Sequence, residues 1–265
     1  MWPVNHLRAI FKIFLHVLLV VGFVLSSALV YVAIRDLHVR RKYQVKLCSF
    51  FSRLSLKVMS VRLQVSGTVP ADGNFLLVAN HTGFIDIFLL ASLCKGVFVT
   101  SVDLRETPGL GEMCKLGACL FVDRRTLVKI KGELGQVREV LQRGLNVILF
   151  PEAAANDGGK IYPFKKTLIA SVAGTDTPIL PAVINFRRVN GEPMSHKWRD
   201  HVFWWGDNSF FTCAWRAHQL KSIEVDIDFC QPVFCESEDH RAEVARLIQH
   251  QVESRYTPIE HPTSV

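Results

Sequence analysis

Strand-like and helix-like stretches alternate along the chain from Val61 onward. The strand-like stretches are rich in β-branched and aromatic residues and cover residues 61–65, 75–79, 97–100, 119–122, 147–150, 179–184 and 223–229. Helical patterns lie between several of them, notably over residues 126–143 and 168–173. This alternation predicts an α/β fold with a largely parallel sheet flanked by helices. In such sheets functional groups collect at the carboxyl ends of strands, so a site is expected there.

The N-terminal segment is the second constraint on the fold. Residues 13–34 are apolar except for His16, Ser26 and Ser27, and a run of about 20 such residues is long enough to cross a bilayer. A secretory signal is the alternative, but no small-residue cleavage site stands out and the apolar core is too long. We therefore expect a helical membrane anchor within residues 1–60, followed by a folded domain over residues 61–255.

Basic residues are more numerous after the apolar run than before it: Arg35, Arg40, Arg41, Lys42 and Lys46 against Arg8 and Lys12. The positive-inside bias therefore places the folded domain on the cytoplasmic side of the membrane. Residues 45–61 predict a second helix, which either lies in the membrane interface or packs on the domain. The two helices also suit a hairpin embedded in a single leaflet rather than a true span.

Composition narrows the class of protein. A net charge of +7 with 49% apolar residues fits a basic, membrane-associated protein. No basic run is interleaved with aromatic residues, which disfavours nucleic-acid binding. The seven cysteines form no Cys-x-x-Cys pair, so we expect free thiols in a reducing compartment and no metal site. Residues 256–265 contain two prolines and are expected to form a mobile tail.

One stretch, Asn80-His81-Thr82-Gly83-Phe84-Ile85-Asp86, joins a predicted buried strand to a predicted helix. A histidine followed by four residues and an aspartate supplies a general base and a carboxylate able to fix its other ring nitrogen. The same spacing also fits a capping or core histidine beside an ordinary first-turn aspartate. Partners elsewhere in the chain must decide between these interpretations.

Three further stretches carry candidate groups. The strand over residues 119–122 is followed by Arg124 and Arg125, and a guanidinium suits the geometry of a phosphate. Glu152 follows another buried strand in the sequence Phe-Pro-Glu. Pro181 interrupts the apolar run 179–183 and predicts a sheet edge, a bulge or a pocket wall. Taken singly, each also fits a solvated charge or an ordinary loop.

Together these stretches resemble the glycerolipid acyltransferase superfamily, and within it the 1-acylglycerol-3-phosphate acyltransferase branch. The matching blocks are Asn-His-x₄-Asp, Gly-x₃-Phe-Val-x-Arg, Phe-Pro-Glu and Leu-Pro-Ala-Val, in the family's order between Phe75 and Val183. The N-terminal segment also resembles the family's membrane-docking element.

The resemblance implies an enzyme that moves a fatty acyl chain from acyl-CoA or acyl-carrier protein to the free hydroxyl of a lysolipid, with no other cofactor and no metal. His81 would be the general base, and Asp86 would orient its imidazole and stabilise its charged form. The residues implied for substrate binding are Arg124 and Glu152 at the acceptor head group, Asn80, Gly83 and Phe84 in the turn, Gly117, Phe121 and Pro151 near the head group, and Pro181 on the acyl side.

The third block departs from the family pattern. The usual Phe-Pro-Glu-Gly-Thr, often followed by arginine, is Phe-Pro-Glu-Ala-Ala over residues 150–154, so a hydroxyl, a glycine and possibly a cation are missing. Lysophosphatidate, giving phosphatidate, is the expected acceptor, and lyso-ornithine lipid or another lysolipid competes with it. Lys160, Lys165 and Lys166 either replace the missing charge or are surface lysines. An inactive membrane-anchored lipid-binding or scaffold protein is the non-enzyme alternative.

Overall fold

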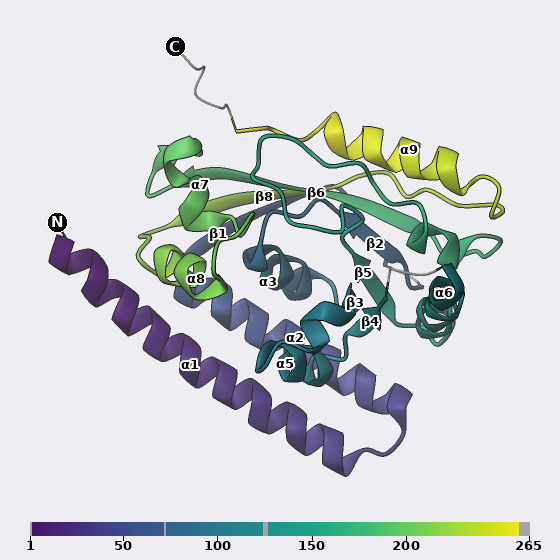
Figure 1. The fold of residues 1–265 in the computed structure, drawn as a ribbon, viewed down its shortest axis with the longest axis horizontal. Coiled ribbons are helices and arrows are strands. Elements are labelled where there is room, and N and C mark those ends of the chain that lie inside the picture. The colour runs from purple at the N-terminus through teal and green to yellow at the C-terminus, as the bar shows by residue number, and fades with distance from the viewer. Residues whose placement is uncertain (1, 72, 124–126, 260–265) are drawn as a thin grey trace.

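The computed structural model of the chain describes residues 2–71, 73–123 and 127–259. Two long helices, α1 (Trp2–Ala33) and α2 (Leu37–Met59), form a hairpin along one flank of the molecule (Figure 1). The second helix begins before the expected residue 45 because Asp36 caps it, accepting the backbone N–H of Val39 at 2.7 Å.

The folded domain is built on a sheet that contains eight strands in the described residues. They are β1 (Val61–Ser66), β2 (Leu76–Ala79), β3 (Gly96–Ser101), β4 (Leu120–Val122), β5 (Asn146–Leu149), β6 (Ile179–Val189), β7 (Glu192–Pro193) and β8 (Ile223–Phe229). Their order is β1-β8-β6-β2-β5-β3-β4, with β7 paired to β6. Every pair is parallel except β6 with β8 and β6 with β7. The predicted largely parallel α/β sheet is confirmed.

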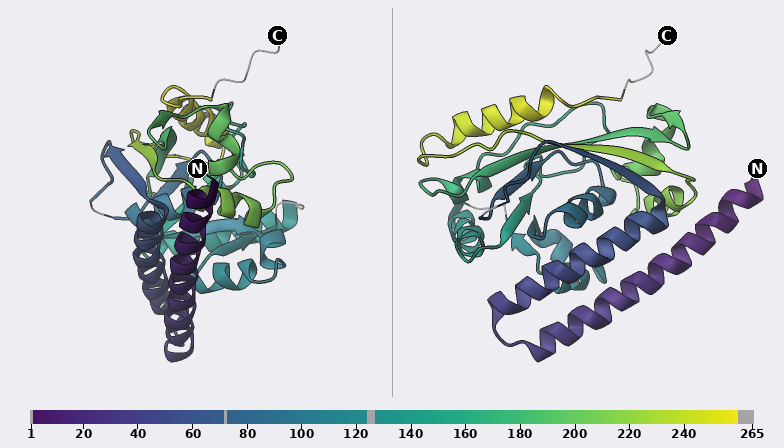
Figure 2. Two further views of the ribbon diagram at one scale, coloured as in Figure 1. Left: turned by 90° about the vertical axis from the view of Figure 1, so that its left-hand side faces the viewer. Right: turned by 180° about the vertical axis from the view of Figure 1, so that it is seen from behind.

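Helices cover both faces of this sheet (Figures 1 and 2). After α1 and α2, the helices of the folded domain are α3 (Phe84–Leu93), α4 (Val102–Arg105), α5 (Leu110–Leu116), α6 (Leu127–Gln142), α7 (His196–Val202), α8 (Phe210–His218) and α9 (Arg241–Glu253). The helix expected over residues 168–173 is a 3₁₀-helix, Leu168–Val172.

The central strands are apolar throughout because each of their faces is buried in a different core. In β2, Leu76 and Val78 join the core beneath α6 and α9, whereas Leu77 and Ala79 join the core beneath α2 and α3. A parallel strand covered by helices on both sides has no solvent face, so its sequence shows no polar alternation. This double burial fixes the position of the residues that follow β2.

Pro181 lies inside the sheet, which corrects the expectation of an edge or a bulge. It stands opposite Val78 in the pairing of β6 with β2. Its carbonyl accepts the N–H of Cys230, which comes directly after β8 ends. The N and O atoms of one strand residue point to the same side of the strand. The missing N–H of Pro181 therefore faces the side of β8, at a point where β8 has already ended.

The end of the described chain is attached to the domain. The hydroxyl of Tyr256 donates to the carbonyl of Gly158 at 2.9 Å, and the N–H of Ile259 donates to the same carbonyl at 2.9 Å. The N–H of Thr257 donates to Asn185 at 2.8 Å. Residues 256–259, which the sequence assigns to a mobile tail, therefore hydrogen-bond to the domain.

Helix α1 lies against the folded domain along most of its length. Arg8 donates to the carbonyl of Gln219 at 3.0 Å, and Ser27 donates to the carbonyl of Leu116 at 2.6 Å. Residues 5–33 are long and apolar enough to cross a membrane by length and composition, and only 11% of their most apolar window is buried within the protein. One side of α1 thus contacts the domain while its other side presents apolar side chains outward.

Candidate active site

The turn between β2 and α3 holds the candidate catalytic residues at the carboxyl edge of the parallel strands. Gly83 immediately precedes α3, and a Cβ added there would meet the backbone nitrogen of Trp204 at 2.9 Å. The N–H of Trp204 in turn donates to the carbonyl of Thr82 at 2.9 Å. A glycine is therefore needed because the chain from residue 204 packs directly on the turn.

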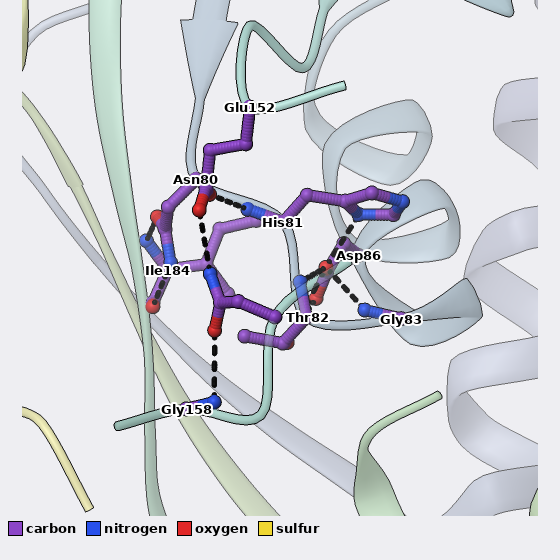
Figure 3. Close-up of polar contacts among 9 residues, drawn as sticks. Asn80, His81, Thr82, Gly83, Asp86, Glu152, Gly158 and Ile184 are labelled. Carbon is purple, nitrogen blue, oxygen red and sulfur yellow. Dashed lines mark hydrogen bonds and ion pairs between the residues drawn. The ribbon is translucent and has the colours of Figure 1, made fainter. Parts of the chain in front are cut away.

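His81 and Asp86 form a hydrogen-bonded pair, as predicted. Nδ1 of His81 lies 2.9 Å from Oδ2 of Asp86 (Figure 3). The aspartate is fully buried, whereas the histidine side chain is 20% exposed. Because the carboxylate accepts hydrogen bonds, Nδ1 carries the proton and Nε2 keeps its lone pair for an incoming group.

Asp86 is held rigidly by the start of its own helix. Its Oδ2 accepts the backbone N–H of Thr82 at 2.6 Å and that of Gly83 at 2.9 Å, and the Thr82 hydroxyl donates to Oδ1 at 3.2 Å. These donors and the positive end of the α3 dipole favour a negative charge on the carboxylate. An imidazolium formed at His81 would therefore face a fixed anion.

Phe150, at the end of β5, supports the imidazole from one side. The rings of His81 and Phe150 stack with centroids 4.0 Å apart and planes 15° from parallel. The contact leaves the ring few orientations, so the Nδ1 bond to Asp86 and the direction of Nε2 are set together.

Glu152 holds the backbone of His81. One carboxylate oxygen accepts the N–H of His81 at 2.7 Å (Figure 3). The other accepts the N–H of Tyr162 at 2.6 Å and the side-chain amide of Asn156 at 2.7 Å. The N–H of Asn156 donates to the carbonyl of His81 at 2.9 Å. Burial raises the pKa of Glu152, against the opposing effect of these donors. Both carboxylate oxygens are thus engaged by the chain itself, and the side chain is 4% exposed.

Asn80 ties the catalytic turn to the neighbouring strand. Its side-chain amide donates to the carbonyl of Ile184 at 3.0 Å, and its side-chain carbonyl accepts the N–H of Ile184 at 2.8 Å. The residue is fully buried, and it continues the pairing of β2 with β6 beyond the last strand residue. This geometry is consistent with the expected role of Asn80 in shaping the turn.

The other predicted residues lie on several elements, and not all of them are at this edge of the sheet. Phe84 opens α3 beside the turn, and Pro151 follows β5. Gly117 ends α5, and the next residue, Ala118, has a φ of 65°. Phe121 lies in β4 with the guanidinium of Arg105 over its ring, 5.7 Å from the centroid. Arg124 and Arg125 fall outside the described residues.

A cavity of about 280 Å³ lies at the carboxyl ends of β4 and β5. The described residues that line it are Val122, Leu149, Pro151, Ala153, Lys165, Thr167 and Leu168. Lys165 is exposed, and its backbone N–H donates to the carbonyl of Pro151 at 2.9 Å. The cavity therefore brings a lysine from a later loop beside the block that departs from the family pattern.

Ala153 has a φ of 70°, a left-handed conformation that costs an L-residue about 1–2 kcal/mol. The family's usual glycine adopts this conformation without strain. The backbone turn thus persists although the glycine has been replaced.

Three residues of the site were not singled out from the sequence. Thr82, Phe150 and Asn156 lie within or beside the recognised blocks. Phe150 and Asn156 contact His81 from about 70 residues away in sequence, whereas the Thr82 hydroxyl contacts Asp86 within the same turn. In the sequence, these residues are marked only by their position next to a motif. That position does not reveal which side chains come into contact. All seven cysteines are free thiols, and the described residues contain no group of three or more His, Cys, Asp or Glu side chains able to hold a metal.

Comparison with known proteins gives consistent results. The model of the Acyltransferase family matches residues 60–185. A lyso-ornithine lipid O-acyltransferase of Brucella abortus is 27% identical over 248 residues, which cover 91% of this chain and 92% of the relative. A 1-acyl-sn-glycerol-3-phosphate acyltransferase of Neisseria gonorrhoeae is 29% identical over 190 residues, covering 71% and 72%.

The fold itself is also found in a solved structure. The crystal structure of the 1-acyl-sn-glycerophosphate acyltransferase of Thermotoga maritima has a TM-score of 0.64 and 23% identity, and covers 97% of this chain and 98% of its own. Fold, motifs and relatives agree on an O-acyltransferase. The chain is therefore similar to the Acyltransferase family over residues 60–185.

Proposed function

We propose that His81 is the general base that activates the free hydroxyl of the lysolipid. The observation that carries the proposal is the 2.9 Å contact between Nδ1 of His81 and Oδ2 of Asp86, which in the neutral imidazole assigns the proton to Nδ1 and the lone pair to Nε2, on a side chain that is 20% exposed. A base within hydrogen-bond reach of the acceptor typically contributes 10²–10⁴-fold to the rate.

The reaction then balances without an acyl-enzyme. The hydroxyl proton passes to Nε2 of His81 as the acceptor oxygen bonds to the thioester carbonyl carbon. The tetrahedral intermediate collapses, the carbon–sulfur bond breaks, and the imidazolium returns its proton to the departing thiolate. Asp86 stabilises the imidazolium throughout, as in other His–carboxylate pairs. The acyl donor in this proposal is acyl-CoA or acyl-carrier protein.

Substitution of the base tests this assignment. We expect His81→Ala to reduce acyl transfer by about 10²–10⁴-fold, because proton removal then falls to water. Release of free thiol and formation of the diacyl product, followed by mass spectrometry, give two independent readouts. His250→Ala, an exposed histidine on α9, is the matched control and should keep full activity. Wild-type rates for His81→Ala in both readouts would exclude the base assignment.

For the acceptor, we propose 1-acylglycerol-3-phosphate, with Lys165 contacting the phosphate. Lys165 lines the same cavity as Pro151 and Ala153, which belong to the block that lacks the family's threonine. A cation there would favour an anionic head group. Lyso-ornithine lipid, whose head group carries a carboxylate and an ammonium, is the alternative. It is favoured by the Brucella relative, which matches 91% of this chain.

Replacement of the lysine distinguishes the two acceptors. We expect Lys165→Met to raise the KM for 1-acylglycerol-3-phosphate about tenfold with little change in kcat, because a charge-assisted contact is worth roughly 1.5–3 kcal/mol. The exposed Lys160 provides the control, Lys160→Met. Both variants are assayed with both lysolipids by mass spectrometry. A higher kcat/KM of the wild type for lyso-ornithine lipid would support the alternative, and an unchanged KM would exclude the role of Lys165.

A further inference from the structure

The region around α8 is unusually rich in aromatic residues. Four of the five tryptophans of the chain lie within residues 198–215, and Phe210 and Phe211 open α8 in the same region. We call residues 198–215 the aromatic segment. Tryptophan and phenylalanine concentrated in one segment are typical of surfaces that meet the boundary between water and lipid.

The aromatic segment lies directly beside α1. Nδ1 of His218, at the end of α8, donates to the carbonyl of Ala214 at 2.7 Å, so its Nε2 accepts from Nδ1 of His16 at 3.1 Å. His6 of α1 stacks on Trp215 with centroids 5.8 Å apart. These contacts place α8 alongside the N-terminal half of α1, as Figure 1 also shows.

The outward surfaces of both helices are apolar and uncovered. Phe211 is 81% exposed, more than any other large apolar side chain in the described residues. On α1, Phe11 and Phe14 are 62% and 59% exposed. Apolar side chains on two adjacent helices form a surface of the kind that marks an interaction site in a soluble protein and a lipid contact in a membrane enzyme.

This surface is connected to the catalytic turn. Phe210 contacts both Phe211 and Phe84, with ring centroids 5.7 Å and 5.4 Å apart. Phe84 opens α3, three residues after His81, and the backbone of Trp204 hydrogen-bonds to Thr82. A row of aromatic rings thus leads from the exposed surface to the site of chemistry.

We propose that the aromatic segment is a second membrane-docking element, which inserts Phe211 into the leaflet that α1 contacts. The occupant is a phospholipid surface, because the exposed apolar side of α1 adjoins the segment and the enzyme's lysolipid acceptor resides in membranes. The choice of lipid as occupant rests on the function proposed above. Docking at both elements would bring the row of rings that leads to Phe84 to the lipid surface, so that a lysolipid could approach the catalytic turn without crossing water.

Tryptophan fluorescence tests this directly. In the full-length Trp2→Phe variant, every remaining tryptophan belongs to the aromatic segment. On vesicles whose phosphatidylcholine carries bromine on its acyl chains, we expect emission to fall by about half relative to unbrominated vesicles, since indoles at the interface lie within reach of the quencher. Equal emission from the two kinds of vesicle, with the protein shown to be bound by flotation, would overturn the proposal.

Two further variants identify the contact. In the Trp2→Phe background, Phe211→Asp should reduce the quenching, whereas Leu247→Asp, at a 47% exposed apolar residue on α9, should leave it unchanged. Phe211→Asp should also lower transfer to a vesicle-borne lysolipid about tenfold while changing transfer to a water-soluble short-chain lysolipid less than about twofold. If Phe211→Asp instead changes only the oligomeric state, a second copy covers the surface and the proposal fails. The quenching is measured without turnover, so an error in the catalytic assignment leaves it unaffected.

Discussion

At the scale of single residues, the imidazole is positioned through both its side chain and its main chain. Asp86 and Phe150 fix the ring, while Glu152 and Asn156 hold the N–H and the carbonyl of His81. Glu152 gains these contacts at the cost of burying a carboxyl group, which raises its pKa. From these contacts we propose a positioning role for Glu152, and the head-group contact that the resemblance implies stays a prediction.

Glu152→Gln tests the positioning role. A glutamine offers one acceptor oxygen and one amide donor to three N–H groups, so at least one is left unpaired at a cost of about 1–3 kcal/mol. We expect kcat to fall about tenfold with an unchanged KM for the acceptor, because the base moves while the head group does not. Steady-state assays of both variants measure this. A raised KM for the acceptor with an unchanged kcat would show that Glu152 binds the head group directly. Glu139→Gln, on the exposed face of α6, is the control.

The same substitution has a defined pH dependence. Because the pKa of Glu152 is raised above its usual 4.5, the folded protein holds this proton after the unfolded chain has lost it. The contribution of Glu152 to stability therefore decreases as pH rises from 4.5 through the folded pKa. The stability advantage of wild type over Glu152→Gln should be largest at the acid end of this window, as measured by thermal unfolding. An advantage that grows with pH would mean that the hydrogen bonds outweigh the burial.

The pairing of His81 with Asp86 could be predicted from the sequence because both residues belong to one strand-to-helix junction. The location of Glu152 could not, since its partner lies 71 residues away and the contact is made to the backbone. The left-handed conformation of Ala153 could not be predicted either, because alanine, unlike glycine, does not indicate a positive φ.

At the scale of elements, a buried lysine joins α1 to the ends of two other helices. Nζ of Lys12 donates to the carbonyl of Met59, the last residue of α2, at 3.2 Å. It also donates to the carbonyl of Leu220, shortly after α8, at 2.8 Å. A cation suits these positions because helix C-termini present unpaired carbonyls and the negative end of the dipole.

Removing this ammonium should weaken the attachment of α1. In Lys12→Met two buried carbonyls lose their donor, at about 1–3 kcal/mol each, and the Tm should fall by several degrees. Differential scanning of the detergent-solubilised protein measures the shift. Lys57→Met, at an exposed position on α2, should leave the Tm unchanged. An equal Tm for both variants would show that the ammonium contributes nothing net to the fold.

Elements with a continuous apolar sequence were predicted well, and those defined by tertiary packing were not. The expected strands all form within one or two residues, except that β6 extends to Val189. Helices α7, α8 and α9 were not predicted from the sequence. In α9 the buried Val244, Ala245, Ile248 and Val252 recur at helical spacing, so a signal was present there among the charged and polar residues. The short apolar segment at residues 168–172 tightens into a 3₁₀-helix.

At the scale of the whole molecule, the path of α1 bears on how the protein meets the bilayer. Arg8 and Ser27 both contact the domain, and the 19 residue steps from one to the other rise about 28 Å along the helix, close to the thickness of a bilayer core. If α1 crossed the membrane, α5 and α8 of one folded domain would lie on opposite sides of it. The structure therefore favours the one-leaflet hairpin, with the catalytic domain proposed to face the cytoplasm.

Labelling from each side of the membrane tests that orientation. With α1 in one leaflet, an N-terminal epitope tag and an Arg35→Cys variant should both react with impermeant reagents in inside-out vesicles and not in intact spheroplasts. The wild-type protein is the control, because it measures the labelling of the seven native cysteines. Reaction of the two positions on opposite sides would establish a membrane span.

The attachment of α1 also has a practical consequence. Shortening such an enzyme at its N-terminus is a common route to a protein that purifies without detergent. Here the removed piece would take Lys12 and Ser27 with it and uncover the side of α2 and α8 that it protects. The shortened protein would lose the exposed apolar side of α1 but expose the surface of α2 and α8 that α1 covers. Protein prepared for biochemical work should therefore keep α1.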